Sequence, residues 1–170
     1  MRVIAFSCAH ISRPETQMEL YGRHLDYSAF ERLRSLIHAD PPDAVVSLGD
    51  LWEPMYDSWD VCSPWVDTLD FIKVRGNHDP GDGLSEMFID GVMYEHGHLN
   101  HRTGKPLKQY PDVDSYNEAV RAMHEGRKLV HGHTHIPFHD PSEWPMDVGS
   151  ITHSATYGEI IDGEPFLRAI

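Results

Sequence analysis

Residues 71–79 have the sequence FIKVRGNHD, in which an apolar run leads directly into Gly76-Asn77-His78-Asp79. Short runs rich in apolar and β-branched residues are typical of strands that are buried on both faces of a sheet. Glycine and polar side chains that follow such a strand lie where α/β proteins form ligand sites. The stretch therefore predicts a buried strand that delivers amide, imidazole and carboxylate groups to a loop.

The same arrangement recurs along the chain. Five further apolar runs have it, at Arg2–Phe6, Ala44–Leu48, Val92–Glu95, Lys128–Val130 and Pro145–Val148. The segments that follow them are Ser7–His10, Gly49-Asp50, His96–His98, His131–His135 and Gly149-Ser150. Because ligand sites of α/β sheets lie at the carboxyl ends of the strands, we expect these segments to gather at one edge.

The intervals between the predicted strands contain helical patterns and turns. Apolar residues recur at helical spacing in residues 28–37 and 115–125, and a shorter helix is predicted at 65–69. Asp-Gly pairs at 90–91 and 162–163 predict two β-hairpins. Parallel strands thus come early and antiparallel strands late, which indicates a mixed sheet, or two stacked sheets, flanked by helices.

Length, charge and cysteine content exclude several classes of protein. The 170 residues suit a single domain, residues 1–170, and 14 Lys+Arg against 27 Asp+Glu give a net charge of -13. This charge argues against strong non-specific binding to nucleic acid or to an anionic membrane surface. Two cysteines do not form a disulfide framework, and no apolar run approaches the roughly 18 residues of a membrane span. We therefore expect a cytoplasmic protein.

The strand ends supply ten side chains that can ligate metal ions: Cys8, His10, Asp50, Asn77, His78, Asp79, His96, His98, His133 and His135. A tetrahedral zinc ion uses about four ligands, so this set favours two adjacent ions, bridged most naturally by Asp50. Two ions about 3.5–4 Å apart are the usual means of holding a phosphoryl group during attack by a metal-bound hydroxide. Histidines outside these clusters, His153 among them, are interpreted as ordinary surface or helix-end residues.

The strand-end segments resemble the five motifs of the calcineurin-like metallophosphoesterases, and the compact length resembles their small bacterial and archaeal phosphodiesterase branch. The matching motifs are Ser7-Cys8-Ala9-His10, Gly49-Asp50, Gly76-Asn77-His78-Asp79, His96-Gly97-His98 and Gly132-His133-Thr134-His135. The resemblance covers residues 1 to about 150. It implies a four-layer α/β/β/α sandwich of two mixed β-sheets flanked by helices, with a dinuclear metal site at the strand ends.

The resemblance also implies a role for each matching residue. Metal ligands would be Cys8, His10 and His135 at the first ion, Asn77, His96 and His133 at the second, and Asp50 as the bridge. His78 would contact the phosphate and protonate the leaving oxygen, with Asp79 orienting its ring. The implied cofactors are two divalent ions (Mn, Zn or Fe), and the implied substrate is a phosphate ester, a phosphodiester rather than a phosphomonoester.

The first motif departs from the family pattern, because Cys8 takes the place of the aspartate in Asp-x-His. A thiolate is also a metal ligand, but a softer one. The substitution keeps two alternatives open. One is a scaffold or binding module that retains the fold without hydrolysis. The other is a cysteine-based phosphatase with Cys8 as nucleophile, for which the chain offers Arg13 but no glycine-rich anion-binding loop.

Overall fold

The computed structural model describes residues 1–11, 19–20, 23–24, 27–52, 69–79, 83–97, 110–124, 126–141 and 143–170. Their strands form two larger sheets and a two-stranded ribbon of β2 (Glu19–Leu20) and β3 (Arg23–His24). The helix predicted around Trp65 and the candidate ligand His98 lie outside the described residues. No helix among the described residues has the length and apolar character needed to cross a membrane.

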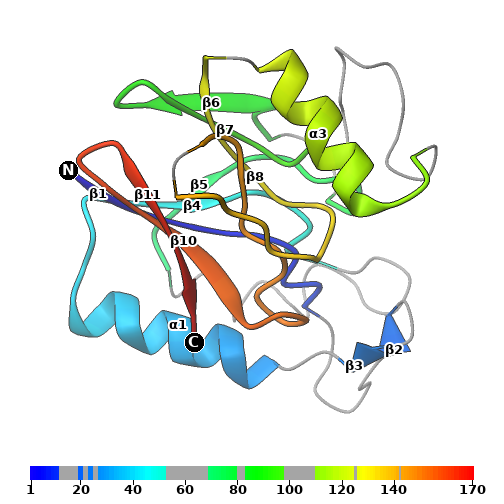
Figure 1. Ribbon diagram of the computed structural model, residues 1–170. Helices are drawn as coiled ribbons and strands as arrows, with labels where there is room; N and C mark the ends of the chain where they lie inside the picture. Colours follow the sequence, from blue (N-terminus) through cyan, green and yellow to red (C-terminus); the bar gives the residue numbers. More distant parts are fainter. Residues whose placement is uncertain are drawn as a thin grey trace.

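The first sheet has five strands in the order β11-β10-β1-β4-β5 (Figure 1). Its members are β1 (Arg2–Phe6), β4 (Ala44–Ser47), β5 (Ile72–Lys73), β10 (Thr156–Ile161) and β11 (Glu164–Ala169). Strand β1 runs parallel to β4, which runs parallel to β5, whereas β10 is antiparallel to both β1 and β11. The late strands are therefore the antiparallel ones here, as the sequence indicated.

The second sheet has four strands in the order β6-β7-β8-β9. They are β6 (Glu86–Ile89), β7 (Val92–Glu95), β8 (Lys128–His131) and β9 (Met146–Asp147). The pair β6–β7 is an antiparallel hairpin, and β7, β8 and β9 are parallel neighbours. Both sheets are thus mixed, but in the second the parallel strands β8 and β9 follow the antiparallel hairpin, which is the reverse of the expected order.

Three apolar clusters hold the layers together. Helix α1 (Tyr27–Ala39) covers the first sheet through a cluster that includes Phe30, Leu33, Ile4 and Phe6. The two sheets share a cluster that includes Val3, Val46, Tyr94, Val130 and Met146. Helix α3 (Val113–Met123) covers the second sheet through Tyr116, Val120, Met93 and Leu129. The resulting order is helix, sheet, sheet, helix, which confirms the predicted α/β/β/α fold (Figure 1).

Backbone hydrogen bonds bring the strand ends of both sheets to one edge. The amide of Cys8 donates to the carbonyl of Gly49 at 2.9 Å, within the first sheet. The amide of Gly132 donates to the carbonyl of His96 at 3.3 Å, within the second. The amide of Ile151, which follows β9, donates to the carbonyl of Ser7 at 3.0 Å and links the two sheets. Loops far apart in the sequence therefore meet in one place.

Candidate metal centre

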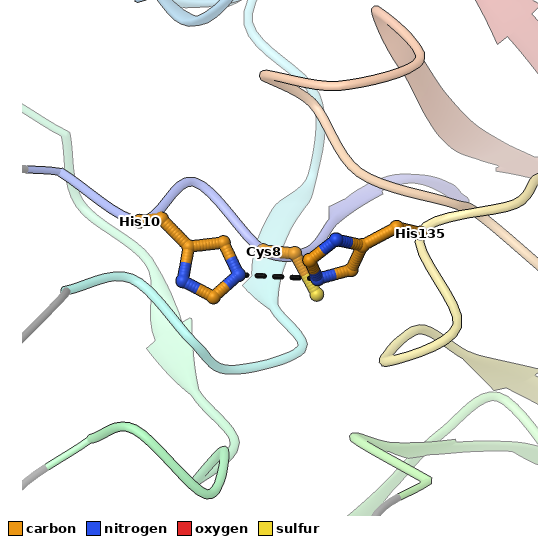
Figure 2. Close-up of side chains that lie close together, drawn as sticks. All are labelled: Cys8, His10 and His135. Carbon is orange, nitrogen blue, oxygen red and sulfur yellow. Dashed lines mark hydrogen bonds between the residues drawn. The ribbon is translucent and has the colours of Figure 1, made fainter. Parts of the chain in front are cut away.

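The first group of ligand atoms comes from Cys8, His10 and His135 (Figure 2). One ligand atom of each lies within 4.8 Å of the others, and all three side chains are buried. The Nε2 atoms of His10 and His135 are 3.1 Å apart. Two imidazoles and a thiol thus converge from the ends of β1 and β8, as expected for the first metal ion.

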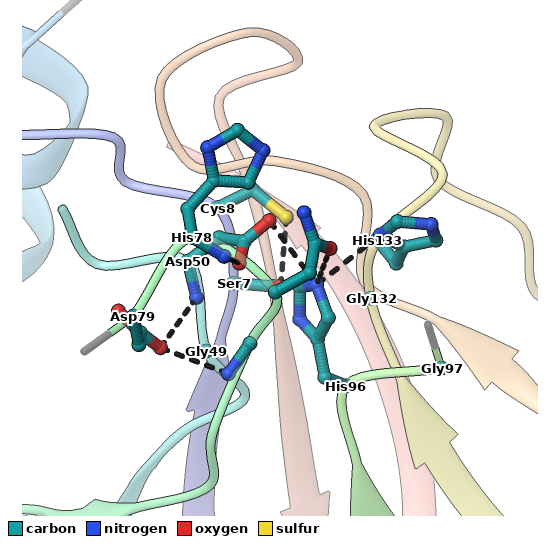
Figure 3. Close-up of polar contacts among 12 residues, drawn as sticks. Ser7, Cys8, Gly49, Asp50, His78, Asp79, His96, Gly97, Gly132 and His133 are labelled. Atoms are coloured by element: carbon teal, nitrogen blue, oxygen red, sulfur yellow. Dashed lines mark hydrogen bonds and ion pairs between the residues drawn. The ribbon is translucent and has the colours of Figure 1, made fainter. Parts of the chain in front are cut away.

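The second group is centred on His96, at the end of β7 (Figure 3). Its Nε2 lies 3.1 Å from Oδ2 of Asp50, 3.2 Å from Oδ1 of Asn77 and 3.2 Å from Nδ1 of His133. A further group consists of Cys8, Asp50 and His96, whose ligand atoms lie within 4.8 Å of one another. The structure therefore brings together the residues predicted for the second ion.

The hydrogen-bonding state of His96 makes this group suitable for a cation. Its Nδ1 lies 2.7 Å from the carbonyl oxygen of Leu48, to which it must donate its proton because a carbonyl only accepts. Nε2 is then the ring atom left to ligate a metal ion, and it faces the Asp50 carboxylate and the Asn77 amide oxygen. Imidazole, carboxylate and amide oxygen are ligands of divalent ions, and a ligating imidazole commonly donates its other N–H to a carbonyl, so the residues fit a metal.

Burial and neighbouring groups shift the pKa values of Asp50 and Cys8. Burial alone would raise the pKa of Asp50, but the neighbouring His96 and His10 rings, with the His78 amide, hold that pKa well below its ordinary range. Burial raises the pKa of the Cys8 thiol well above its ordinary value, and the Asp50 charge raises it further. A buried thiol of raised pKa is a poor free nucleophile, which argues against the cysteine-phosphatase alternative.

His78 and Asp79 lie beside the cluster, and the Asp79 carboxylate has a role other than the predicted one. The half-buried His78 ring packs edge-on against the His10 ring, with centroids 5.1 Å apart. The Asp79 carboxylate accepts hydrogen bonds from the backbone amides of Asp50, Leu51 and Gly76 at 2.9–3.0 Å. We predicted that Asp79 orients the His78 ring, but its oxygens are bound to the backbone, so it fixes the loops instead.

Five of the candidate ligands have left-handed backbone conformations. The φ angles are 54° at Cys8, 45° at His10, 53° at Asp50, 73° at His133 and 62° at His135. L-residues reach this region at a cost of about 1–2 kcal/mol each, so surrounding contacts must hold them there. A strained conformation repeated at five ligands is typical of a functional site.

A buried hydrogen-bond network behind the site supports His133 and His135. Thr134, which lies between them, hydrogen-bonds Oδ2 of Asp147 and the carbonyl of Ile136 (3.0 Å). The other Asp147 oxygen accepts from the Gly149 amide at 2.8 Å. Burial raises the pKa of Asp147 to about 8, so its proton is retained at neutral pH. The network anchors the loop to the end of β9.

Several of these supporting residues were missed in the sequence. His153, interpreted as an ordinary surface residue, has its Nδ1 only 2.8 Å from Nδ1 of His135, so that interpretation was wrong. The hydroxyls of Ser150 and Thr152 donate to the carbonyl of Cys8 at 2.8 and 3.0 Å. The sequence signal for them is the apolar run that ends at Gly149-Ser150, which resembles the runs before the other ligand segments.

The fold and the cluster together define a class: an α/β/β/α protein with a metal-ligand site at the carboxyl ends of its strands. Residues 1–160 match the family model of the calcineurin-like phosphoesterase superfamily domain. The chain therefore belongs to this superfamily, as its motifs predicted. Among curated proteins, none has a sequence significantly similar to this chain.

Solved structures show the same fold at low sequence identity. The phosphoesterase YfcE from E. coli is 19% identical, with a TM-score of 0.57 over 95% of this chain and 89% of its own. An archaeal phosphodiesterase is 13% identical, with a TM-score of 0.54 over all of both chains. Zinc-complexed Vps29 from Entamoeba histolytica is 14% identical, with a TM-score of 0.54 over 100% of this chain and 98% of its own. These likenesses establish the fold.

Proposed function

We propose that the protein is a metal-dependent phosphoesterase that hydrolyses a phosphodiester, and less readily a phosphomonoester, at a dinuclear centre. Membership of the superfamily supports hydrolysis of phosphate esters. The observation that carries the proposal is the convergence of electron-pair donors on Nε2 of His96, at 3.1–3.2 Å. Imidazole nitrogen, carboxylate oxygen and amide oxygen are ligands of divalent ions, which supports a metal ion among them.

The ligands divide into two sets under this proposal. Cys8, His10 and His135 hold the first ion, and Asp50, Asn77, His96 and His133 hold the second. Divalent ions (Zn²⁺, Fe²⁺ or Mn²⁺) bound there would polarise the phosphoryl group and make a water nucleophilic. The net charge of -13 then presents no obstacle to an anionic substrate, because the ions reverse the local sign.

The chain's own contribution to the chemistry is positioning and proton transfer. The backbone amide of His78 donates to Oδ1 of Asp50 at 2.9 Å, which fixes the residue beside the cluster. Its half-buried ring packs against the His10 ring. In the proposal its ring contacts the phosphate and gives a proton to the leaving oxygen. Asp79 acts through the backbone by tying the loops of Asp50 and Gly76 to each other.

The test combines elemental analysis with a substrate panel. Metal-free protein is reloaded with Zn²⁺, Fe²⁺ or Mn²⁺ and assayed on bis(p-nitrophenyl) phosphate and p-nitrophenyl phosphate. We expect two metal equivalents per chain, hydrolysis that a chelator abolishes, and faster turnover of the diester. A single equivalent in every preparation contradicts the dinuclear centre.

His78→Ala tests the assigned acid. Turnover should fall by roughly 10²–10⁴, because a positioned general acid contributes that much. Metal content should stay at the wild-type value, because His78 is not a ligand. The matched control is His38→Ala at the exposed end of α1, which should change neither quantity. Equal loss of metal and activity in His78→Ala would make it a ligand instead.

A second candidate function is a metal-binding module that has lost hydrolysis. Cys8 at the aspartate position and the likeness to Vps29, whose name is not that of an enzyme, favour it. The same assay separates the two: two bound equivalents with no hydrolysis under any of the three ions would favour the module over the enzyme.

A further inference from the structure

Cys8 has a place in the cluster that the family resemblance did not assign. Its sulfur belongs to the group with His10 and His135 and also to the group with Asp50 and His96. Among the described residues that form these groups, Cys8 is the one that both contain. The sulfur therefore lies close to ligand atoms of both predicted ions, whereas the resemblance placed it at the first ion.

Asp50, the expected bridge, is turned towards one side. Its Oδ2 faces Nε2 of His96 at 3.1 Å, and its Oδ1 accepts the backbone amide of His78 at 2.9 Å. In the described part of the chain, Asp50 groups with His96 and Cys8 but not with the His10–His135 pair. One carboxylate oxygen thus faces the predicted second ion, and the other is hydrogen-bonded to the backbone.

We propose that the Cys8 thiolate bridges the two metal ions of this site, in the place where the resemblance puts the Asp50 carboxylate. The proposal rests on the proposed dinuclear centre and deepens it. When the thiol becomes a ligand, its S–H bond breaks, the proton passes to the solvent, and the electron pair stays on sulfur. The thiolate retains enough lone pairs to bind a second ion.

The dimensions of such a bridge agree with a catalytic pair. A zinc–sulfur bond is about 2.3 Å long, so one sulfur holds two zinc ions no more than about 4.6 Å apart. Catalytic ion pairs are separated by about 3.5–4 Å, which lies within that limit. A shared thiolate also makes both sites soft, so zinc and iron should be preferred over manganese at both positions.

The backbone around Cys8 holds the sulfur in this place. Its amide donates to Gly49 at 2.9 Å, and its carbonyl accepts the hydroxyls of Ser150 and Thr152. The Ser7 hydroxyl lies 3.0 Å from the sulfur. Because the side chain is fully buried, neighbouring atoms limit its rotation about χ1.

Cadmium-113 NMR of the full-length protein tests the bridge without an activity assay. Metal-free protein is titrated with ¹¹³Cd²⁺, and correlations from cadmium to cysteine β-protons are recorded. We expect two equivalents to bind and both ¹¹³Cd resonances to correlate with the same pair of Cys8 β-protons. Cys62→Ser should leave both correlations in place, which assigns them to Cys8.

The other outcomes separate the bridge from the proposed function. Two bound ions with only one correlated to Cys8 would overturn the bridge and leave the dinuclear centre standing. One bound ion would overturn the dinuclear centre itself. Cys8→Ser should lower the affinity of both equivalents by at least about tenfold, since loss of a shared ligand affects both ions. Weakening of one equivalent alone would again contradict the bridge.

Discussion

At one end of its strands the chain turns through Asp-Gly pairs, and at the other it turns through the candidate metal ligands. The hairpin end contains Asp90-Gly91, between β6 and β7, and Asp162-Gly163, between β10 and β11. All four residues have φ between 50° and 79°. Asp-Gly is one of the pairs that adopt this conformation readily, so local sequence is enough to form these turns.

At the site end, residues that seldom adopt the left-handed conformation have it as well. Cysteine, histidine and aspartate take φ values of 45–73° there, at positions 8, 10, 50, 133 and 135. Hydrogen bonds from distant segments, such as those of Thr134 to Asp147 and of Ser150 to Cys8, hold them in place. The hairpin end is therefore specified locally and the site end by tertiary packing, so equal substitutions at the two ends should have unequal effects.

The largest difference is expected between Gly76→Ala and Gly91→Ala. A Cβ on Gly76 would lie 2.0 Å from Oδ1 and 2.3 Å from the amide nitrogen of Asp50, both inside contact distance. The Asp50 loop must then move, which should cost about 3 kcal/mol or more of unfolding free energy and abolish binding of the second ion. Urea unfolding and metal titration measure the two effects.

Gly91→Ala is the matched control at the hairpin end. Nothing lies within 4 Å of the added Cβ, but φ is +76°, so only the left-handed conformation of alanine is penalised. That penalty is about 1–2 kcal/mol, and metal binding should be unchanged. Equal destabilisation by the two substitutions would show that packing does not distinguish the two ends.

The next difference is expected between Asp50→Asn and Asp90→Asn, which change two aspartates of similar φ, 53° and 50°. At position 50 the new amide N–H would donate to Nε2 of His96, now 3.1 Å from the carboxylate, and occupy the lone pair that the ion needs. Affinity for the second equivalent should fall by about 100-fold or more, since a charged ligand is also lost. Isothermal titration with Zn²⁺ measures it.

Asp90→Asn should leave metal affinity and stability nearly unchanged, because Asn-Gly forms the same turn as Asp-Gly. Circular dichroism melting and the same zinc titration provide the comparison. If Asp50→Asn bound both equivalents with wild-type affinity, the carboxylate would not be a ligand, and the candidate centre would have to be redrawn around the histidines.

The contrast also explains what the sequence could predict. The hairpins at Asp90-Gly91 and Asp162-Gly163 followed from local turn chemistry, and the helices covering the two sheets followed from apolar periodicity. The gathering of Cys8, Asp50 and His96 followed from one rule, that the carboxyl ends of strands in an α/β fold form the ligand site. Each of these features depends on residues close in the chain or on a general property of sheets.

The missed features depend on the register between distant loops. That His153 contacts His135, or that the Asp79 carboxylate caps three backbone amides, follows from where the loop after β9 and the loop after β5 come to rest. No local pattern encodes such a contact. The shared position of the Cys8 sulfur belongs with these, because it depends on how two sheets are stacked.

A smaller effect is expected for Thr134→Val, which tests the support of the site end. Valine keeps the shape of threonine but removes the hydroxyl that contacts Asp147 and Ile136. A buried Asp147 oxygen loses its partner, so unfolding free energy should fall by about 2–3 kcal/mol. Zinc affinity should fall as well, because His133 and His135 are less firmly held.

Thr134→Ser is the control for this effect, since it retains the hydroxyl and should recover most of the zinc affinity. Zinc titration and urea unfolding of both variants make the comparison. Wild-type zinc affinity in Thr134→Val would mean that the left-handed histidines hold their geometry without this network.

The smallest effect concerns the pH dependence of stability in the metal-free protein. Burial raises the pKa of Asp147 from 3.8 to about 8, so the folded state binds its proton more tightly and stability falls as pH rises through that range. Burial lowers the pKa of His131, 3.7 Å away, from 6.5 to about 4, which makes stability rise over that lower range. The two effects oppose each other up to pH 6.5, and above it only the Asp147 effect continues.

Asp147→Asn should remove that decline. The amide mimics the protonated acid: its oxygen accepts from Gly149, and its N–H donates to the Thr134 hydroxyl, which donates to Ile136. Between pH 6.5 and 8 the wild-type unfolding free energy should fall by up to about 2 kcal/mol, at no more than about 1.4 kcal/mol per pH unit, and the variant should lose little. Urea unfolding in the presence of a chelator measures both profiles. Parallel profiles would mean that Asp147 is already ionised in the folded protein at pH 6.5.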